Sequence, residues 1–240
     1  MTNYPINLGI TRPLSSGQKT KTGADNTGSS SSISTKIPKE LKEKIFERDQ
    51  FTCHCCGFQS QKYQEILHKN QNPIDFNEDN LITVCNFCLQ CFQMERVSDM
   101  KSGVLIWMPE IEQTTLNHLA RAIYVARISQ GPVAEAARKA LTTLMARREE
   151  AKKRIHTDDP YILSMVLKDY LGPKHYEDRK RKLDGLRLFP LDRRIIKEAD
   201  LEFNQFPQIL AYWRSKNGPF GGKTPPQWIS IYLELSQKAA

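Results

Sequence analysis

Two short cysteine-rich segments decide the fold of this 240-residue chain: CHCCG at residues 53–57 and CNFCLQC at residues 85–91. Each contains a Cys-x-x-Cys pair, a spacing that places two thiolates about one tetrahedron edge apart. If the fold brings the two pairs together, they complete a four-sulfur metal site. The sequence therefore predicts one structural zinc ion, Zn²⁺, held by Cys53, Cys56, Cys85 and Cys88.

The use of cysteine as a whole favours metal over disulfides. All six cysteines lie between residues 53 and 91, and clustered thiols in a reducing compartment are typical of metal sites. The alternatives are four free buried thiols or a redox-active pair, although neither pair has the strand–Cys-x-x-Cys–helix pattern of a thioredoxin. Cys55 and Cys91 are left over, and Cys91 either packs or replaces a ligand. His54 is expected at the surface.

The composition describes a well-hydrated chain with enough apolar residues for a packed core. Hydrophobic residues make up 39% of the chain, and the formal net charge is +8. Such a charge is compatible with nucleic acid, an acidic protein partner or an anionic membrane face, and it does not choose among them. The chain has no apolar run of about 18 residues, and its N-terminus does not read as a secretory signal. We therefore expect a cytoplasmic protein.

We expect an α+β, mainly helical fold in three parts. Residues 1–35 are rich in Ser, Thr and Gly and are predicted to form a disordered tail. Residues 36–109 are predicted to form the zinc module. Residues 110–240 are predicted to form a helical region packed on that module.

Apolar periodicity and capping residues predict the elements within these parts. In the zinc module we expect a helix from Ser34 or Thr35 to residue 48, strands at 63–68, 81–85 and 104–109, and a helix at 86–97. In the helical region we expect helices at 110–129, 133–154, 158–171, 206–214 and 227–235. Gly57 is expected to adopt the left-handed backbone that closes the first cysteine turn.

The residues around the two cysteine pairs resemble a zinc-bearing HNH nuclease module. The resemblance rests on ERDQFTCHCCG (47–57), EILHKNQNP (65–73) and EDNLITVCNFCLQC (78–91). It implies a ββα fold, with an Arg–Asp helix end before the first pair. By the same resemblance, His68 takes the place of the general base and Asn80 that of a structural asparagine. Leu67 and Leu89 take the places of two metal-binding residues.

Those two leucines predict that the module is not an enzyme. A nuclease of this type uses a divalent ion to stabilise the charge that develops on the phosphate. Such an ion needs oxygen or imidazole ligands, and the side chains of Leu67 and Leu89 offer neither. We therefore expect a nuclease scaffold that keeps its structural zinc and has lost its catalytic metal. An active nuclease that uses His68 is the competing hypothesis.

Together with its length and its helical remainder, the sequence resembles the DotN/IcmJ family of the Dot/Icm type IVB secretion system. The motif-level match covers about residues 40–95. The resemblance implies a non-catalytic adaptor subunit of the coupling complex, at the cytoplasmic face of the inner membrane. It implies binding to the C-terminal segment of a DotL-like coupling ATPase and to other coupling-complex subunits, and help in recruiting effectors.

A nucleic-acid-binding zinc protein is the alternative function. It is favoured by the basic stretches at 138–154 and 174–182, although acidic residues alternate with the basic ones as they do on a solvated helix face. For the adaptor, an apolar groove would bind a partner helix through aromatic residues. The candidates, which are also candidates for the core, are Trp107, Tyr124, Tyr212, Trp213 and Trp228.

Overall fold

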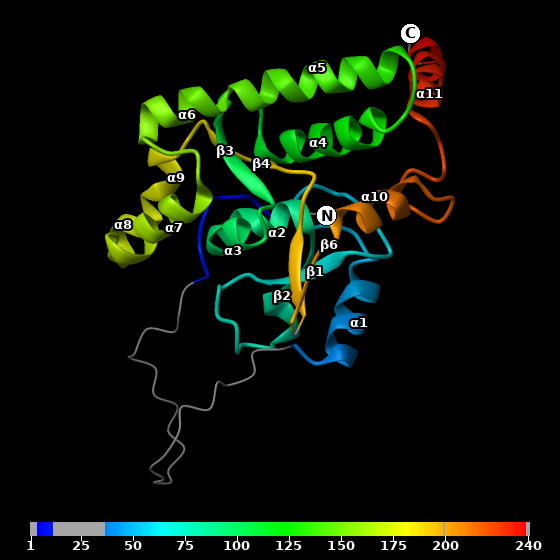
Figure 1. Cartoon of the computed structure of the whole chain (residues 1–240). Coiled ribbons are helices and arrows are strands. Elements are labelled where there is room, and N and C mark those ends of the chain that lie inside the picture. The colour runs from blue at the N-terminus through cyan, green and yellow to red at the C-terminus, as the bar shows by residue number, and fades with distance from the viewer. Residues whose placement is uncertain (1–3, 12–36, 199, 239–240) are drawn as a thin grey trace.

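The computed structural model describes residues 4–11, 37–198 and 200–238, which form a mixture of helices and small antiparallel sheets (Figure 1). This confirms the α+β class of the prediction. The helices are α1 (Lys39–Arg48), η1 (Glu78–Asn80, a 3₁₀ turn), α2 (Asn86–Phe92), α3 (Met94–Asp99), α4 (Gln113–Arg127), α5 (Pro132–Ala146), α6 (Arg148–Ile155), α7 (Pro160–Asp169), α8 (Pro173–Glu177), α9 (Arg179–Lys182), α10 (Phe206–Arg214) and α11 (Pro225–Lys238). The strands are β1 (Gln64–His68), β2 (Leu81–Cys85), β3 (Gly103–Trp107), β4 (Leu186–Pro190), β5 (Ile195–Glu198) and β6 (Leu201–Asn204).

The cysteine region is built on the antiparallel pair of β1 and β2, which leads directly into α2. Leu67 of β1 lies opposite Ile82 of β2, and both side chains are buried. The strands predicted at 63–68 and 81–85 are therefore confirmed. The helix predicted at 86–97 is interrupted at Gln93, whose backbone (φ −135°, ψ 54°) is not helical, so that α2 and α3 are separate.

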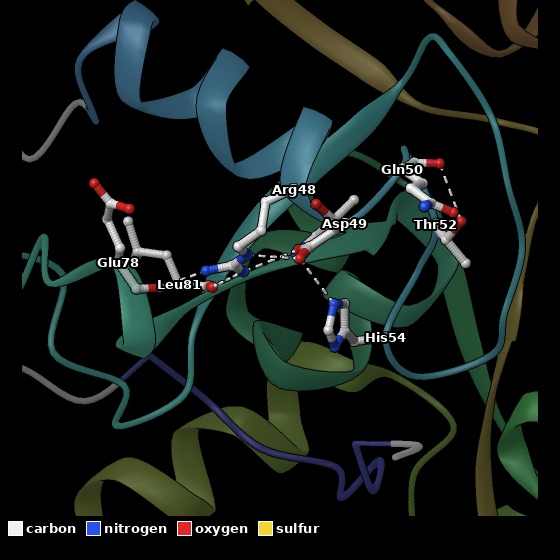
Figure 2. A network of polar contacts seen from close by, with 8 residues as sticks. Arg48, Asp49, Gln50, Thr52, His54, Glu78 and Leu81 are labelled. Carbon is white, nitrogen blue, oxygen red and sulfur yellow. Dashed lines mark hydrogen bonds and ion pairs between the residues drawn. The ribbon is translucent and has the colours of Figure 1, made fainter. Parts of the chain in front are cut away.

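A network of polar contacts ties the end of α1 to β2, as Figure 2 shows. The buried Asp49 carboxylate accepts hydrogen bonds from Arg48 Nε (2.8 Å) and from the backbone N–H of Thr83 (2.8 Å). Arg48 also donates to the backbone carbonyls of Glu78 (2.8 Å) and Leu81 (2.7 Å). The first cysteine turn begins at Cys53, four residues after Asp49, so this network holds the approach to the turn against β2.

The second sheet joins the two regions that the sequence separates at residue 109. In this sheet β3 pairs with β4, and Leu105 lies opposite Leu188. The region predicted as helical, residues 110–240, also contains β4 and the β5–β6 hairpin, which are not predicted from the sequence. Since the partner of β4 is far upstream in the sequence, local periodicity could not reveal the strand.

Helix α4 lies against α5 on one side and β4 on the other, with α5 and α6 spanning the top of the view in Figure 1. Leu116 and Tyr124 of α4 are fully buried. The predicted helix at 133–154 is two helices, which meet at Arg147. The start of α7 is capped as its sequence indicates, because the Asp159 side chain accepts from the Tyr161 N–H and Pro160 occupies the first turn.

Aromatic side chains connect α10 to α4 and α2 in the largest core cluster. The centre of the Phe206 ring lies 5.3 Å from that of Tyr124 and 5.9 Å from that of Trp213. The ring centres of Trp213 and Phe87 are 5.6 Å apart. Tyr124 and Trp213 are 0% and 4% exposed, so these two of the predicted partner-binding aromatics belong to the core. In the described part of the chain, no helix combines the length and the apolar character needed to cross a membrane.

Residues 4–11 do not behave as the disordered tail predicted for residues 1–35. Gly9 donates to the carbonyl of Cys91 (2.8 Å) and accepts from the N–H of Met94 (3.0 Å). Leu8 and Ile10 are buried in the same region. The tail prediction is therefore wrong for this segment, because its apolar residues find a partner surface between α2 and α9. The remainder of that prediction, and the helix start predicted at residue 34 or 35, lie outside the described residues.

Candidate metal centre

The fold brings four cysteine sulfurs together, as the spacing of the pairs predicts. The Sγ atoms of the cluster all lie within 4.8 Å of one another. Cys56 Sγ lies 3.8 Å from Cys85 Sγ, which is about the 3.8 Å edge of a tetrahedron with metal–sulfur bonds of about 2.3 Å. All six cysteines of the chain are free thiols. The four-cysteine cluster consists of Cys53, Cys56, Cys85 and Cys88.

The first pair lies in a turn that its own backbone closes. The Gly57 N–H donates to the Cys53 carbonyl (2.8 Å), and Gly57 adopts φ +71°, as expected of a glycine that closes such a turn. The Cys53 N–H donates to the carbonyl of Phe58 (3.0 Å), and the His54 N–H donates to that of Thr83 on β2 (2.9 Å). The turn is therefore stabilised by hydrogen bonds within itself and by one to β2, the strand that leads into the second pair.

The second pair lies where a strand becomes a helix, so the expectation that neither pair has a strand–Cys-x-x-Cys–helix arrangement is wrong for Cys85 and Cys88. Cys85 is the last residue of β2 and the N-cap of α2, and Cys88 lies in the first turn of that helix. Both side chains are buried, with exposed fractions of 3% and 0%. The change from extended to helical backbone turns the two thiols toward the same point, which a continuous strand would not do.

The donor set fits a thiophilic cation. Hydrogen bonds from neighbouring thiols lower the pKa of Cys53. The hydrogen bond with Cys53 alone would raise the pKa of Cys56, but hydrogen bonds with Cys85 and Cys88 lower it to about 5. Burial raises the pKa of Cys85. A metal ion bound by the four sulfurs, of which that of Cys56 is half-buried and the other three are buried, would displace the protons of the thiols.

Helix α4 supplies polar groups to the cluster, and the sequence patterns do not identify them in advance. Arg121 Nη2 lies 2.6 Å from Cys85 Sγ, and Asn117 Nδ2 lies 3.3 Å from Cys88 Sγ. His118 Nε2 lies 2.7 Å from the carbonyl oxygen of Cys56. The available signal is the spacing of 117, 118 and 121, which places these polar residues on one side of a mostly apolar helix.

The two remaining cysteines and His54 have different environments. Cys91 is fully buried, donates to the Phe87 carbonyl (3.4 Å) and has a raised pKa because of that burial, so it packs in the core. Cys55 is also buried, and a hydrogen bond with Cys53 raises its pKa, so it lies beside the cluster. His54 is half-buried, with Nε2 at 3.1 Å from Asp49 Oδ1, rather than free at the surface.

Leu67 and Leu89, the positions predicted to have lost a catalytic metal, lie among other apolar side chains. Leu67 and Leu89 are each 6% exposed and belong to the main core cluster. His68 is half-buried against the Phe76 ring (6.1 Å), and burial lowers its pKa. Asn80 closes the loop before β2, accepting from the Asn70 N–H (3.0 Å) and donating to a backbone carbonyl.

Comparison with known proteins identifies a relative that is named as a protein of a type 4 apparatus. No protein-family model matches the chain. The chain is 30% identical over 166 residues to the type 4 apparatus protein DotN of Legionella pneumophila. The match covers 68% of this chain and 77% of DotN. The chain therefore belongs to the DotN family, which confirms the family resemblance drawn from the sequence.

Proposed function

We propose that this chain is a non-catalytic adaptor subunit of a type IVB secretion coupling complex. The observation that carries the proposal is its relationship to DotN, which is named as a protein of the type 4 apparatus. The match spans most of both chains, which supports a shared architecture rather than a shared motif. In this role the chain works at the cytoplasmic face of the inner membrane, where its partners hold it.

The proposed partner is the C-terminal segment of a DotL-like coupling ATPase, and through it the chain helps to recruit effectors. The described surface supports a docking role, because α4, α5 and α11 line an apolar groove of about 430 Å³. Trp228 and Ile229 of α11 line this groove. Tyr232 and Leu233 of the same helix are exposed. An apolar face of a partner segment fits a surface of this kind.

In this proposal the four-cysteine cluster holds one structural zinc ion. Four sulfur ligands complete a tetrahedral shell and leave no position for water or substrate, which is typical of structural zinc. The ion would contribute to folding by tying the first cysteine turn to β2 and α2. The fit rests on the 4.8 Å limit that encloses all four sulfur atoms.

The absence of catalysis is proposed from the two leucines. Leu67 and Leu89 are buried among apolar side chains, which supports the loss of a second metal site between the cysteine pairs. We expect the purified protein with Mg²⁺ or Mn²⁺ to leave supercoiled plasmid uncut. Cutting that disappears in the His68→Ala variant would refute a non-catalytic role.

Nucleic-acid binding, the alternative, receives less support from the structure. In α6, Lys152 pairs with Glu149 (2.8 Å) and Arg154 pairs with Glu150 (2.9 Å), so these basic side chains are partly neutralised within their own helix. Binding to phosphates would show as an affinity for duplex DNA that falls steeply with salt. A titration at two salt concentrations therefore separates this alternative from the adaptor.

The experiment that tests the proposal is affinity purification of the full chain from its native cytosol, followed by identification of the bound proteins and metal analysis. We expect a coupling ATPase and about one zinc per chain. The Cys85→Ser variant should lose the metal and accumulate poorly. Recovery of nucleic acid without an ATPase, or less than about half an equivalent of zinc in unstripped protein, contradicts the corresponding part of the proposal.

A further inference from the structure

Arg121 is a buried cation whose guanidinium contacts cysteine sulfur atoms. Its side chain is 1% exposed, and Nη2 lies 2.6 Å from Cys85 Sγ and 3.7 Å from Cys56 Sγ. Nε and Nη1 are buried without a hydrogen-bond acceptor among the described residues. Within the same residues no carboxylate forms an ion pair with it. A guanidinium in this position needs a negative partner, and the cysteine cluster is the one in contact.

Two aromatic rings pack against the guanidinium and orient it toward the cysteine cluster. The Arg121 Cζ atom lies 4.1 Å from the centre of the Phe58 ring and 5.0 Å from that of Phe87. Cation–π contacts of this kind stabilise a desolvated cation while restricting its rotamers. Phe58 follows the first cysteine turn, and Phe87 lies between the two cysteines of the second pair. Both halves of the cysteine cluster thus contribute to the pocket that receives Arg121.

The charge of a filled cluster explains why a cation is needed there. Four thiolates around one Zn²⁺ leave a net charge of −2, and three of the four cysteines are 3% exposed or less. A buried excess of negative charge is unfavourable without a compensating group. Hydrogen bonds to coordinated sulfur also withdraw electron density from it, which tunes the bond to the metal.

We propose that Arg121 is the buried counter-ion of the four-cysteine cluster and that, as a positioning residue on α4, it sets how tightly the cluster holds its metal ion. This rests on the proposed structural zinc. Because α4 lies in the region after residue 110, the metal centre would then connect the cysteine module to the helical region. Asn117 adds a second contact from the same helix, at 3.3 Å from Cys88 Sγ.

The test compares two substitutions in the full chain, Arg121→Met and Arg121→Lys. The first removes the charge with little change of volume, and the second keeps the charge without the planar fork. We expect Arg121→Met to bind zinc about 10–100-fold more weakly than the wild type in competition with a chelator. We expect Arg121→Lys to lie between the two. Arg179→Met is the matched control, because Arg179 is 4% exposed but donates to the Leu8 carbonyl instead of to sulfur.

A spectroscopic measurement separates this role from a general loosening of the fold. In the Co²⁺-loaded protein, loss of a cation beside the thiolates should move the sulfur-to-cobalt charge-transfer band to lower energy in Arg121→Met. Arg179→Met should leave the band in place even if it lowers stability. If Arg121→Met does not fold, Arg121→Gln is measured in its place. If neither neutral variant folds while Arg121→Lys folds and binds metal, the requirement for charge is supported.

Two results overturn the inference. One is a wild-type affinity and band position in Arg121→Met, and the other is a Lys variant as impaired as the Met variant. Failure of the underlying metal site looks different, because the wild-type protein itself would then bind neither Zn²⁺ nor Co²⁺.

Discussion

Replacing Asp49 by Asn should destabilise the protein in a pH-dependent way. In the wild type the carboxylate accepts from Arg48 Nε (2.8 Å), Arg48 Nη2 (3.1 Å) and the Thr83 N–H (2.8 Å), and it lies 3.1 Å from His54 Nε2. Figure 2 shows the Arg48 and His54 side chains directed toward the Asp49 carboxylate. An asparagine of the same shape keeps one acceptor oxygen and turns an N–H₂ group toward the remaining donors.

The magnitude follows from the contacts that are lost. A hydrogen bond to a charged group contributes about 1.5–3 kcal/mol, and Asp49 is 4% exposed, so water does not replace the lost acceptor. We expect Asp49→Asn to lower the free energy of unfolding by about 2–3 kcal/mol at pH 7. For a chain of this size that corresponds to a Tm lower by about 4–12 °C.

The pH dependence has a definite sign. Burial alone would raise the pKa of the Asp49 carboxyl, but the hydrogen bonds from Arg48 and Thr83 outweigh burial and hold the pKa below its usual value. A carboxyl with a depressed pKa in the folded protein contributes stability above its unfolded pKa of about 3.9. That contribution is lost as the pH falls through the folded pKa. The difference in stability between wild type and variant should therefore shrink below about pH 4.

The assay is urea unfolding followed by circular dichroism, from pH 7 down to pH 3.5, on wild type and Asp49→Asn in parallel. Metal release at low pH affects both proteins and cancels in the difference. Asp99→Asn is the matched control, because Asp99 is exposed and its substitution should change stability by no more than about 0.5 kcal/mol. An Asp49→Asn protein as stable as the wild type at pH 7 would refute the reasoning, as would a gap that widens in acid.

Three further predictions concern packing and titration. Ile10→Ala should lower the free energy of unfolding by about 2–4 kcal/mol, because Ile10 is 5% exposed, and unchanged stability in urea would mean that the N-terminal segment does not dock. Tyr124→Phe leaves the Pro190 carbonyl without the phenolic donor at 2.7 Å and should cost about 1–3 kcal/mol, measured in the same way. His68 should titrate by NMR below 6.5, because burial disfavours the imidazolium, and a higher midpoint would contradict its placement.

Local patterns identify the elements whose signals lie within a few residues. The caps of α7, the Gly57 turn and the boundaries of β2 follow from side-chain chemistry that acts over one turn of backbone. β4 has only a short sequence signal, because its five residues (LRLFP) contain a single apolar–charged–apolar alternation and end in proline, and in the structure all five are buried. Its conformation depends on pairing with β3, which only the folded chain brings beside it.

The N-terminal segment illustrates the same limit. Residues 4–11 have an apolar side chain at every second position (Tyr4, Ile6, Leu8 and Ile10), but they precede a stretch rich in Ser and Gly, and the disorder predicted for residues 1–35 rests on that composition. In the structure, the carbonyl of Cys91 accepts from the Gly9 N–H, and Arg179 donates to the Leu8 carbonyl (2.9 Å). These partners lie far along the chain, and no pattern in the segment points to them.

The sequence by itself determined the chemistry of the candidate metal centre, because a Cys-x-x-Cys pair orients two thiols through its own local backbone. It also determined the apolar character of positions 67 and 89, on which the proposed loss of catalysis rests. The tertiary structure decided what surrounds the sulfurs. Arg121 reaches Cys85 only because α4 packs against α2 and β4, and the same packing buries its guanidinium beside cysteine sulfur.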